Sequence, residues 1–166
     1  MKKIGLISDS HGYIDEKVIG HLADVDEIWH AGDVGDMAIL NLLPGDKKLR
    51  AVFGNIDDQF ARIKFLEEEV FEIEGVKVYM VHIGGTPPRY AKGIKKRILE
   101  IKPKLFICGH SHICRVEFDQ TTKSLYMNPG AIGVQGFHQV RTMLKFELED
   151  GEIKNLIAVE LGKRAK

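Results

Sequence analysis

Cysteine is scarce in this sequence, and neither sign of charge is in excess. The two cysteines, Cys108 and Cys114, cannot form the disulfide framework of a small secreted domain, so we expect a reduced, intracellular protein. Lys and Arg together number 24, as do Asp and Glu, which leaves no net field to attract an anionic polymer or membrane. The composition therefore argues against a nucleic-acid partner.

Long apolar runs are also missing. No segment approaches the ~20 apolar residues of a membrane-spanning helix. The apolar part of the N-terminal stretch MKKIGLIS ends before Asp9, which is too short for the core of a signal peptide. We therefore expect a cytoplasmic location and no membrane partner.

The overall composition is that of one ordinary folded domain. Of its 166 residues, 44% are hydrophobic and 29% are charged, as is typical of a globular protein with a substantial core. No internal repeat, low-complexity tract or linker divides the chain. We expect a single domain over residues 1–166, with a solvated, frayed tail at 162–166.

Short runs rich in Ile, Val, Leu and Phe alternate with segments of helical spacing. The runs predict strands at 2–8, 26–31, 48–53, 76–82 and 104–109. Helices are predicted at 15–23, 36–43 and 87–101, the last beginning at Pro87–Pro88. Beyond residue 113, antiparallel strands are predicted at 115–118, 124–128, 142–149 and 152–161, with a hairpin turn at Asp150–Gly151. This order predicts an α/β domain with two sheets, a largely parallel first half and a meander in the second.

The segment 89–104 is strongly basic. Ile94, Ile98 and Ile101 recur at helical spacing within it, so we interpret it as a surface helix with its lysines in water. The alternative is a patch that attracts a phosphorylated substrate.

Polar side chains follow each of the first five predicted strands. Because the carboxyl ends of parallel strands converge on one crevice, we expect these side chains to lie close together. Any one of the motifs alone is compatible with an ordinary turn, but their joint occurrence after successive strands favours a site. Its members are Asp9, His11, Asp33, Asn55, His82, His110 and His112.

This set of two carboxylates, one amide and four imidazoles indicates bound cations. Burying unpaired charge costs on the order of several kcal/mol, which a cation would offset. Oxygen and imidazole ligands without thiolate suit Mn²⁺, Fe, Zn²⁺ or Ni²⁺. Because seven ligands exceed what one ion binds, we expect two metals with one carboxylate bridging them.

The stretch ICGHSHIC, residues 107–114, admits two other interpretations, a closed zinc site and a redox pair. A closed site with four donors in one short segment is disfavoured, because tetrahedral sites join two separated donor pairs. Cys108 ends an apolar strand and is interpreted as a core residue. His110 and His112 are therefore assigned to the larger cluster.

These motifs resemble the signature of the calcineurin-like metallophosphoesterase superfamily. The resemblance covers roughly residues 4–160, and Asn128-Pro129-Gly130 resembles the compact prokaryotic phosphodiesterase branch. It implies a single-domain α/β/β/α sandwich of two mixed sheets flanked by helices. The blocks that carry it are Asp9-Ser10-His11, Gly32-Asp33, Gly54-Asn55, His82 and Gly109-His110-Ser111-His112.

Carried over by position, the resemblance implies a ligand set for each of two divalent metals, with manganese the first choice and nickel, zinc or iron the alternatives. Asp9, His11 and His112 would hold one ion. Asn55, His82 and His110 would hold the other, with Asp33 between them.

The implied reaction is hydrolysis of a small phosphodiester by a metal-bridging hydroxide, with Asp33, Asn55 and His82 acting through the metals and no protein nucleophile. Two divalent ions, two carboxylates and one hydroxide leave a net charge of about +1, which matches a diester monoanion better than a monoester dianion.

Two positions depart from the family pattern. Ile56 stands where many relatives have a histidine that donates a proton, which predicts a preference for good leaving groups. Ile83 likewise replaces a histidine that often follows His82. Asp57 would either orient a ligand or cap the next helix.

The remaining histidines have no clear place in the pattern. His30 either orients the bridging carboxylate or packs at the strand end, and His21 and His138 are expected to have surface or structural roles.

Two further functions stay open. One is hydrolysis of phosphomonoesters, nucleotides or nucleic acid. The other is a low-activity protein-interaction scaffold, such as the retromer-subunit relatives of this fold, although all seven ligand positions here carry competent donors. A homodimer or homotetramer would also suit such relatives.

Overall fold

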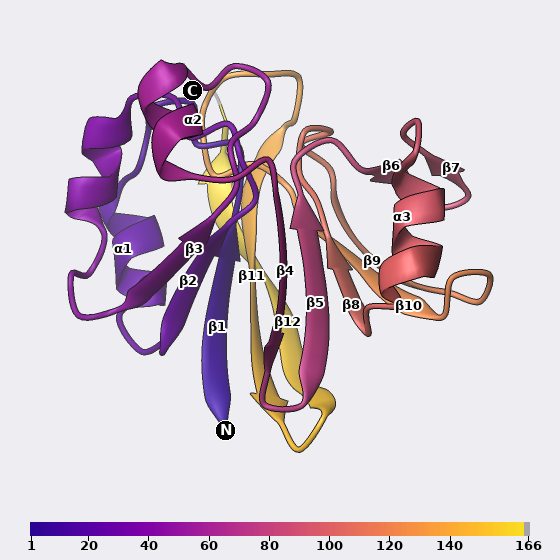
Figure 1. Ribbon diagram of the computed structural model, residues 1–166. Coiled ribbons are helices and arrows are strands. Elements are labelled where there is room, and N and C mark those ends of the chain that lie inside the picture. Colours follow the sequence, from indigo (N-terminus) through magenta and orange to yellow (C-terminus); the bar gives the residue numbers. More distant parts are fainter. Residues whose placement is uncertain (165–166) are drawn as a thin grey trace.

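Two mixed β-sheets of five strands face each other in the computed structural model, which describes residues 1–164 (Figure 1). The first sheet has the order β12 (Glu152–Lys163), β11 (Val140–Glu149), β1 (Lys2–Ile7), β2 (Glu27–His30), β3 (Lys48–Ala51). The second has the order β4 (Glu68–Ile73), β5 (Val76–Val81), β8 (Leu105–Ile107), β10 (Ser124–Pro129), β9 (Cys114–Asp119). Strands β6 (Gly85–Thr86) and β7 (Arg89–Tyr90) form a separate small hairpin.

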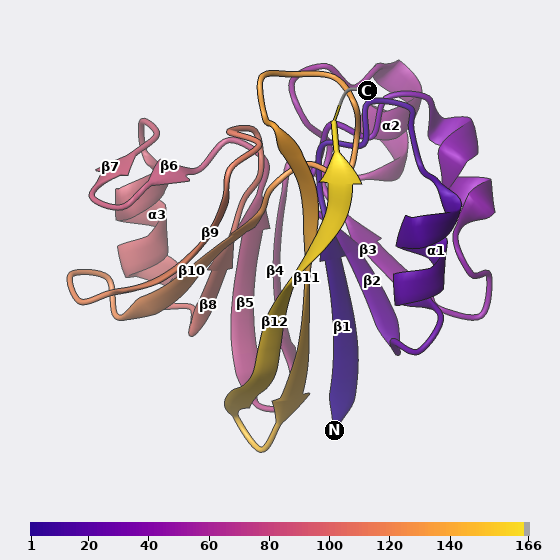
Figure 2. The same cartoon turned by 180° about the vertical axis from the view of Figure 1, so that it is seen from behind.

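Helices cover the outer faces of both sheets, as Figure 2 also shows from behind. Helix α1 (Glu16–Leu22) and the 3₁₀ helix η1 (Met37–Leu42) pack on the first sheet, and α3 (Ile94–Ile101) packs on the second. The short helix α2 (Gln59–Lys64) lies near the upper ends of the strands in Figure 1. The α/β/β/α sandwich expected from the sequence is confirmed. None of the described helices is long and apolar enough to span a membrane.

The core between the sheets comes from alternating positions on their strands. In β1, Ile4 and Leu6 face the second sheet, whereas Ile7 packs toward α1. This alternation is the period of two expected of a strand covered on both faces. Burial of both faces explains the continuous apolar runs from which β1, β2 and β8 were predicted.

Helix α3 confirms the interpretation of the basic segment as a surface helix. Ile98 and Ile101 are buried against the second sheet, with Ile94 packed beside them. Its predicted start was wrong, because Pro87–Pro88 joins β6 to β7 and the helix begins only at Ile94.

The largely parallel first half is confirmed, but the single meander expected in the second half was wrong. Strands β1, β2 and β3 are parallel in the first sheet, and β5, β8 and β10 are parallel in the second. The hairpin of β9 and β10 extends the second sheet, whereas β11 and β12 return to the first. Apolar strands look alike in either sheet, so the alternation along the sequence does not reveal which sheet each strand joins.

The C-terminal segment expected to be a frayed tail is in part a paired strand. Strand β12 runs to Lys163, pairing with Val140, and the Arg164 N–H donates to the Gln139 carbonyl at 2.9 Å. Only residues 165–166 of the predicted tail lie outside the described residues. The predicted hairpin turn is confirmed, since Asp150 and Gly151 have φ of 50° and 77° between the paired ends of β11 and β12.

Candidate metal centre

All seven predicted ligand residues lie at the ends of strands from both sheets. Asp9 and His11 follow β1, Asp33 follows β2, and Asn55 lies beyond β3 in the first sheet. His82 follows β5, and His110 and His112 follow β8, in the second sheet. The expected crevice is therefore a seam between two sheets and not the edge of one.

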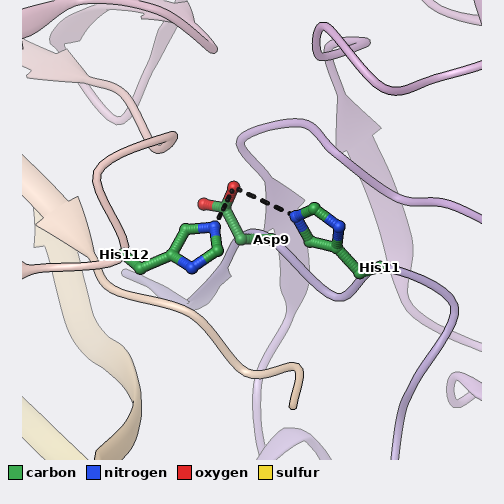
Figure 3. Close-up of side chains that lie close together, drawn as sticks. All are labelled: Asp9, His11 and His112. Carbon is green, nitrogen blue, oxygen red and sulfur yellow. Dashed lines mark ion pairs between the residues drawn. The ribbon is translucent and has the colours of Figure 1, made fainter. Parts of the chain in front are cut away.

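Six of these residues form two groups of three. One group is Asp9, His11 and His112, and the other is Asp33, His82 and His110. Within each group, one potential ligand atom per residue lies within 4.8 Å of the others. Figure 3 shows His11 and His112 approaching Asp9 from opposite sides.

Asp9 uses its two carboxylate oxygens differently. Oδ2 accepts hydrogen bonds from the Ser8 hydroxyl at 2.7 Å and from the His110 backbone N–H at 3.0 Å. Oδ1 has no hydrogen-bond donor among the described residues and lies 3.2 Å from His112 Nε2 and 3.9 Å from His11 Nε2. One oxygen is thus anchored, while the other is free to bind a cation.

Asp33 lies between the two groups. Its Oδ1 accepts the Ile56 N–H at 3.1 Å, and its Oδ2 lies 3.2 Å from His82 Nε2 and 3.4 Å from His11 Nε2. Burial raises the pKa of Asp33, but the two imidazoles and the Ile56 N–H outweigh it and hold that pKa well below its usual range. The carboxylate is therefore ionised and faces a histidine of each group.

Hydrogen-bond partners lie beside the rings of two of the histidines. His82 Nδ1 lies 2.7 Å from the Ala31 carbonyl, which accepts its proton and leaves Nε2 facing the centre. His110 Nδ1 lies 3.0 Å from Asn55 Oδ1, which brings Asn55 to the group of Asp33, His82 and His110. All seven predicted residues are therefore brought together.

The backbone at the centre is strained. Asp9, His11, Asp33, His110 and His112 all have φ between 45° and 71°, the left-handed region that L-residues rarely adopt. Each such residue costs on the order of 1–3 kcal/mol and persists only where the surroundings enforce it, as at functional sites. Close approach also requires Gly54, since a Cβ there would lie 2.0 Å from Asp33 Oδ1.

Asp57 does not cap the next helix, and its contacts are with the loops that carry two of the predicted ligands. Its Oδ1 accepts the Gly35 N–H at 2.9 Å and its Oδ2 accepts the Gly54 N–H at 2.8 Å. It thereby joins the two loops that carry Asp33 and Asn55. The cap of α2 is Asp58, whose side chain accepts the Ala61 N–H.

His30 packs at the strand end and makes no contact with the Asp33 carboxylate. Its Nδ1 accepts the Gly32 N–H at 3.1 Å, and its Nε2 lies 2.8 Å from the Ser10 hydroxyl. Burial lowers the pKa of His30 to about 4, so the ring is neutral near pH 7.

His138 is the residue that the sequence pattern missed. Its Nδ1 lies 3.1 Å from His112 Nδ1, on the side of that ring away from Asp9. It belongs to the loop before β11 and follows no strand, so nothing in its sequence position indicates this contact.

The cysteines take no part in the centre. Cys108 is buried beneath α3 with Tyr126, and burial raises the pKa of its thiol to about 12. Cys114 is half-buried and packs against the core between the sheets.

The donor set fits a divalent metal. Asp9 Oδ1, His11 Nε2 and His82 Nε2 are buried atoms with no hydrogen-bond partner among the described residues, and they face the same space. Leaving such atoms unpaired costs about 1–3 kcal/mol each, which a cation between them would offset. The mixture of carboxylate, amide and imidazole donors is that of a transition-metal site.

Comparisons with known proteins agree with this chemistry. A family model described as a calcineurin-like phosphoesterase superfamily domain matches residues 1–151. A probable metallophosphoesterase of Methanocaldococcus jannaschii is 32% identical over 164 residues, covering 95% of this chain and 81% of that protein.

Two solved structures share the fold at low sequence identity. An archaeal phosphodiesterase has a TM-score of 0.76 at 20% identity, covering 95% of this chain and 99% of its own. Vps29 of Entamoeba histolytica, in complex with zinc, has a TM-score of 0.74 at 16% identity, covering 95% and 98%. Because the family model spans nearly the whole chain and the Methanocaldococcus jannaschii protein matches along most of its length, this chain belongs to the calcineurin-like phosphoesterase superfamily.

Proposed function

We propose that the chain is a phosphodiesterase that uses two divalent metal ions. Asp9, His11 and His112 would hold one ion. Asn55, His82 and His110 would hold the other, and Asp33 would bridge the two. The observation that carries this proposal is the position of Asp33 Oδ2, 3.4 Å from a nitrogen of the first group and 3.2 Å from a nitrogen of the second.

The family is metal-dependent, and manganese is our first choice of ion, with nickel, zinc and iron as alternatives. The chemistry that bound divalent ions supply is polarisation of a phosphoryl oxygen and activation of a water molecule for attack on phosphorus. The chain itself supplies orientation. Ser8 anchors the far oxygen of Asp9, and the Ala31 carbonyl fixes the ring of His82.

A cleft beside Asn55 and His82 supports a substrate that carries an organic group on its phosphate. The cleft has a volume of about 510 Å³ and apolar walls that include Phe53, Val81 and Ile83. A diester carries two organic groups and a single negative charge. That charge matches the net charge of about +1 expected of the centre with two divalent ions bound. The similarity in fold to an archaeal phosphodiesterase supports the same class.

Phosphomonoester hydrolysis is the second candidate, because Arg62 and Lys92 also line this cleft. Arg62 already donates to the backbone carbonyls of Asp57 and Gly54. Lys92 is therefore the cation better able to offset the second charge of a monoester.

The test compares a bis-aryl phosphodiester with the matching aryl monoester. Metal-stripped protein would be assayed after adding back Mn²⁺, Ni²⁺, Zn²⁺ or Mg²⁺. We expect metal-dependent diester cleavage that is lost in Asp33→Asn and retained in Asp46→Asn, a substitution of an exposed carboxylate outside the centre.

The other outcomes separate the alternatives. Faster cleavage of the monoester would overturn the diester assignment and favour the second candidate. Tight metal binding without turnover of either ester would favour a protein-interaction scaffold.

A further inference from the structure

A chain of two hydrogen bonds runs from the Gly133 carbonyl through His138 to His112 of the candidate metal centre. His138 Nε2 lies 2.9 Å from the Gly133 carbonyl oxygen, and His138 Nδ1 lies 3.1 Å from His112 Nδ1. At the other end of the His112 ring, Nε2 lies 3.2 Å from Asp9 Oδ1. The two imidazoles meet edge to face, with centroids 5.0 Å apart and planes at 78°.

The carbonyl at the start of this chain determines where each proton lies. A carbonyl oxygen only accepts, so Nε2 of His138 must carry the proton that it donates to Gly133. In a neutral ring the Nδ1 of His138 is then an acceptor, and the hydrogen bond between the rings must be donated by His112 Nδ1. The lone pair of His112 is consequently on Nε2, the atom that faces Asp9.

The loop that carries His138 is held from two directions. The Gly133 N–H donates to the Asp9 carbonyl at 3.1 Å, which ties the loop to the segment after β1. Arg164 binds its other end, donating from Nε to the His138 carbonyl at 2.8 Å. The contact therefore belongs to a fixed loop and not to a free surface side chain.

Close packing supports the same conclusion. Gly136 has a φ of 123°, and a Cβ at this position would lie 2.3 Å from His112 Nδ1. The absence of a side chain at Gly136 is what allows the loop to bring His138 against the outer edge of the His112 ring.

We propose that His138 is a positioning residue for the ion held by Asp9, His11 and His112. It keeps His112 in the tautomer whose Nε2 can bind a cation, in the way that the Ala31 carbonyl does for His82. This inference rests on the proposed metal centre. It adds a residue outside the family's signature blocks and predicts that the two ions depend on it unequally.

Two conservative variants separate the two hydrogen bonds. In His138→Asn the amide oxygen takes the place of Nδ1 and can still accept from His112, but the bond to Gly133 is lost. In His138→Gln the terminal amide takes the place of Nε2 and can still donate to Gly133, but nothing accepts from His112. His138→Ala removes both bonds, and His21→Ala, on the exposed side of α1, is the matched control.

The first readout is the tautomer of His112 in metal-free protein, measured by long-range ¹H–¹⁵N NMR at a pH where the ring is neutral. We expect Nδ1 to be protonated in the wild type, His138→Asn and His21→Ala. A mixture of tautomers is expected in His138→Gln and His138→Ala.

The second readout is calorimetric titration with Mn²⁺. We expect one of two sites to weaken by about 10–100-fold in His138→Ala and His138→Gln, and neither site to weaken in His138→Asn or His21→Ala. Equal weakening of both sites, or equal affinities in His138→Ala and the wild type, would overturn the proposal.

The two readouts also separate this inference from the proposed function. A wild type with the expected tautomer that binds no cation would contradict the metal centre and with it the role of His138. A wild type that binds two ions without a tautomer preference would contradict the role of His138 alone.

Discussion

Ile56 follows Asn55 beside the candidate metal centre, and its side chain is 45% exposed. Its backbone N–H donates to Asp33, so a side chain at this position projects from a fixed point beside the Asp33 carboxylate. We predict that Ile56→His raises the turnover of a phosphodiester with an alkyl leaving group by ~10²-fold, because an imidazole there could protonate a poor leaving group.

The measurement is the ratio of kcat for alkyl and bis-aryl diesters in the wild type, Ile56→His and Ile56→Gln. Glutamine is polar but has no titratable proton and should leave the ratio unchanged. A histidine variant with the wild-type ratio would show that proton donation does not limit this enzyme.

Gly54 offers a second test at the scale of one residue. A Cβ at this position would lie 2.0 Å from Asp33 Oδ1, so Gly54→Ala must displace the Asp33 carboxylate. We predict cation binding about 10–100-fold weaker, the magnitude typical of disturbing the support of a metal ligand. Gly45→Ala is the control, since nothing lies within 4 Å of a Cβ at that position. Equal affinities in the two variants would contradict the prediction.

At the scale of elements, an ion pair joins the start of α1 to β11. Asp15 caps α1 by accepting the Val18 N–H, and its other oxygen accepts from Arg141 Nη1 at 2.8 Å. Burial raises the pKa of Asp15, but the hydrogen bonds from Arg141 and the Val18 N–H, together with the charge of Arg141, outweigh it, so the pKa of Asp15 is lowered on balance. The folded state thus binds a proton less readily than the unfolded state does.

The lowered pKa of Asp15 determines how the free energy of unfolding depends on pH. The stabilisation by Asp15 is present above its unfolded pKa of about 4 and is lost as pH falls through the lower folded pKa. We predict that Asp15→Asn, which keeps a good cap, destabilises the protein at pH 7 and that the difference narrows below about pH 4. Urea unfolding midpoints at several pH values measure this, and a constant difference would contradict it.

Elements also show how far the sequence alone could predict this structure. The ligand blocks were found because each follows an apolar strand, and strand ends are easily located. Strand β4 was missed because its glutamates hide the alternation of Phe71 and Ile73, which pack on the core from an edge strand.

Other elements were too short to be predicted from the sequence pattern. Helix α2 has only six residues, too few for a clear period, and β6 and β7 have two each. His138 was missed for a different reason. Its contact with His112 is set by a loop tied to Arg164 at the far end of the chain, a relation that no local pattern contains.

At the scale of the whole molecule, the proposed metals would connect the two sheets. We predict that metal removal by a chelator lowers Tm and that adding Mn²⁺ restores it. At 100 times Kd each site adds about 2.7 kcal/mol to the free energy of unfolding, or roughly 5–10 °C in Tm for a protein of this size.

Thermal unfolding of Asp33→Asn and His21→Ala, with and without Mn²⁺, provides the check. The rise in Tm should be lost in the first variant and kept in the second. A rise of the same size in both would mean that the ions bind elsewhere.

The path of the chain between the sheets has a consequence for folding order. The second sheet is one uninterrupted length of chain, from β4 to β10, whereas the first is assembled from lengths on either side of it. Each proposed ligand group takes donors from both, since His112 completes Asp9 and His11, and His82 and His110 complete Asp33. A chain in which only one sheet has formed holds neither complete set, so cation uptake would report that the two halves have docked and not that either has folded by itself.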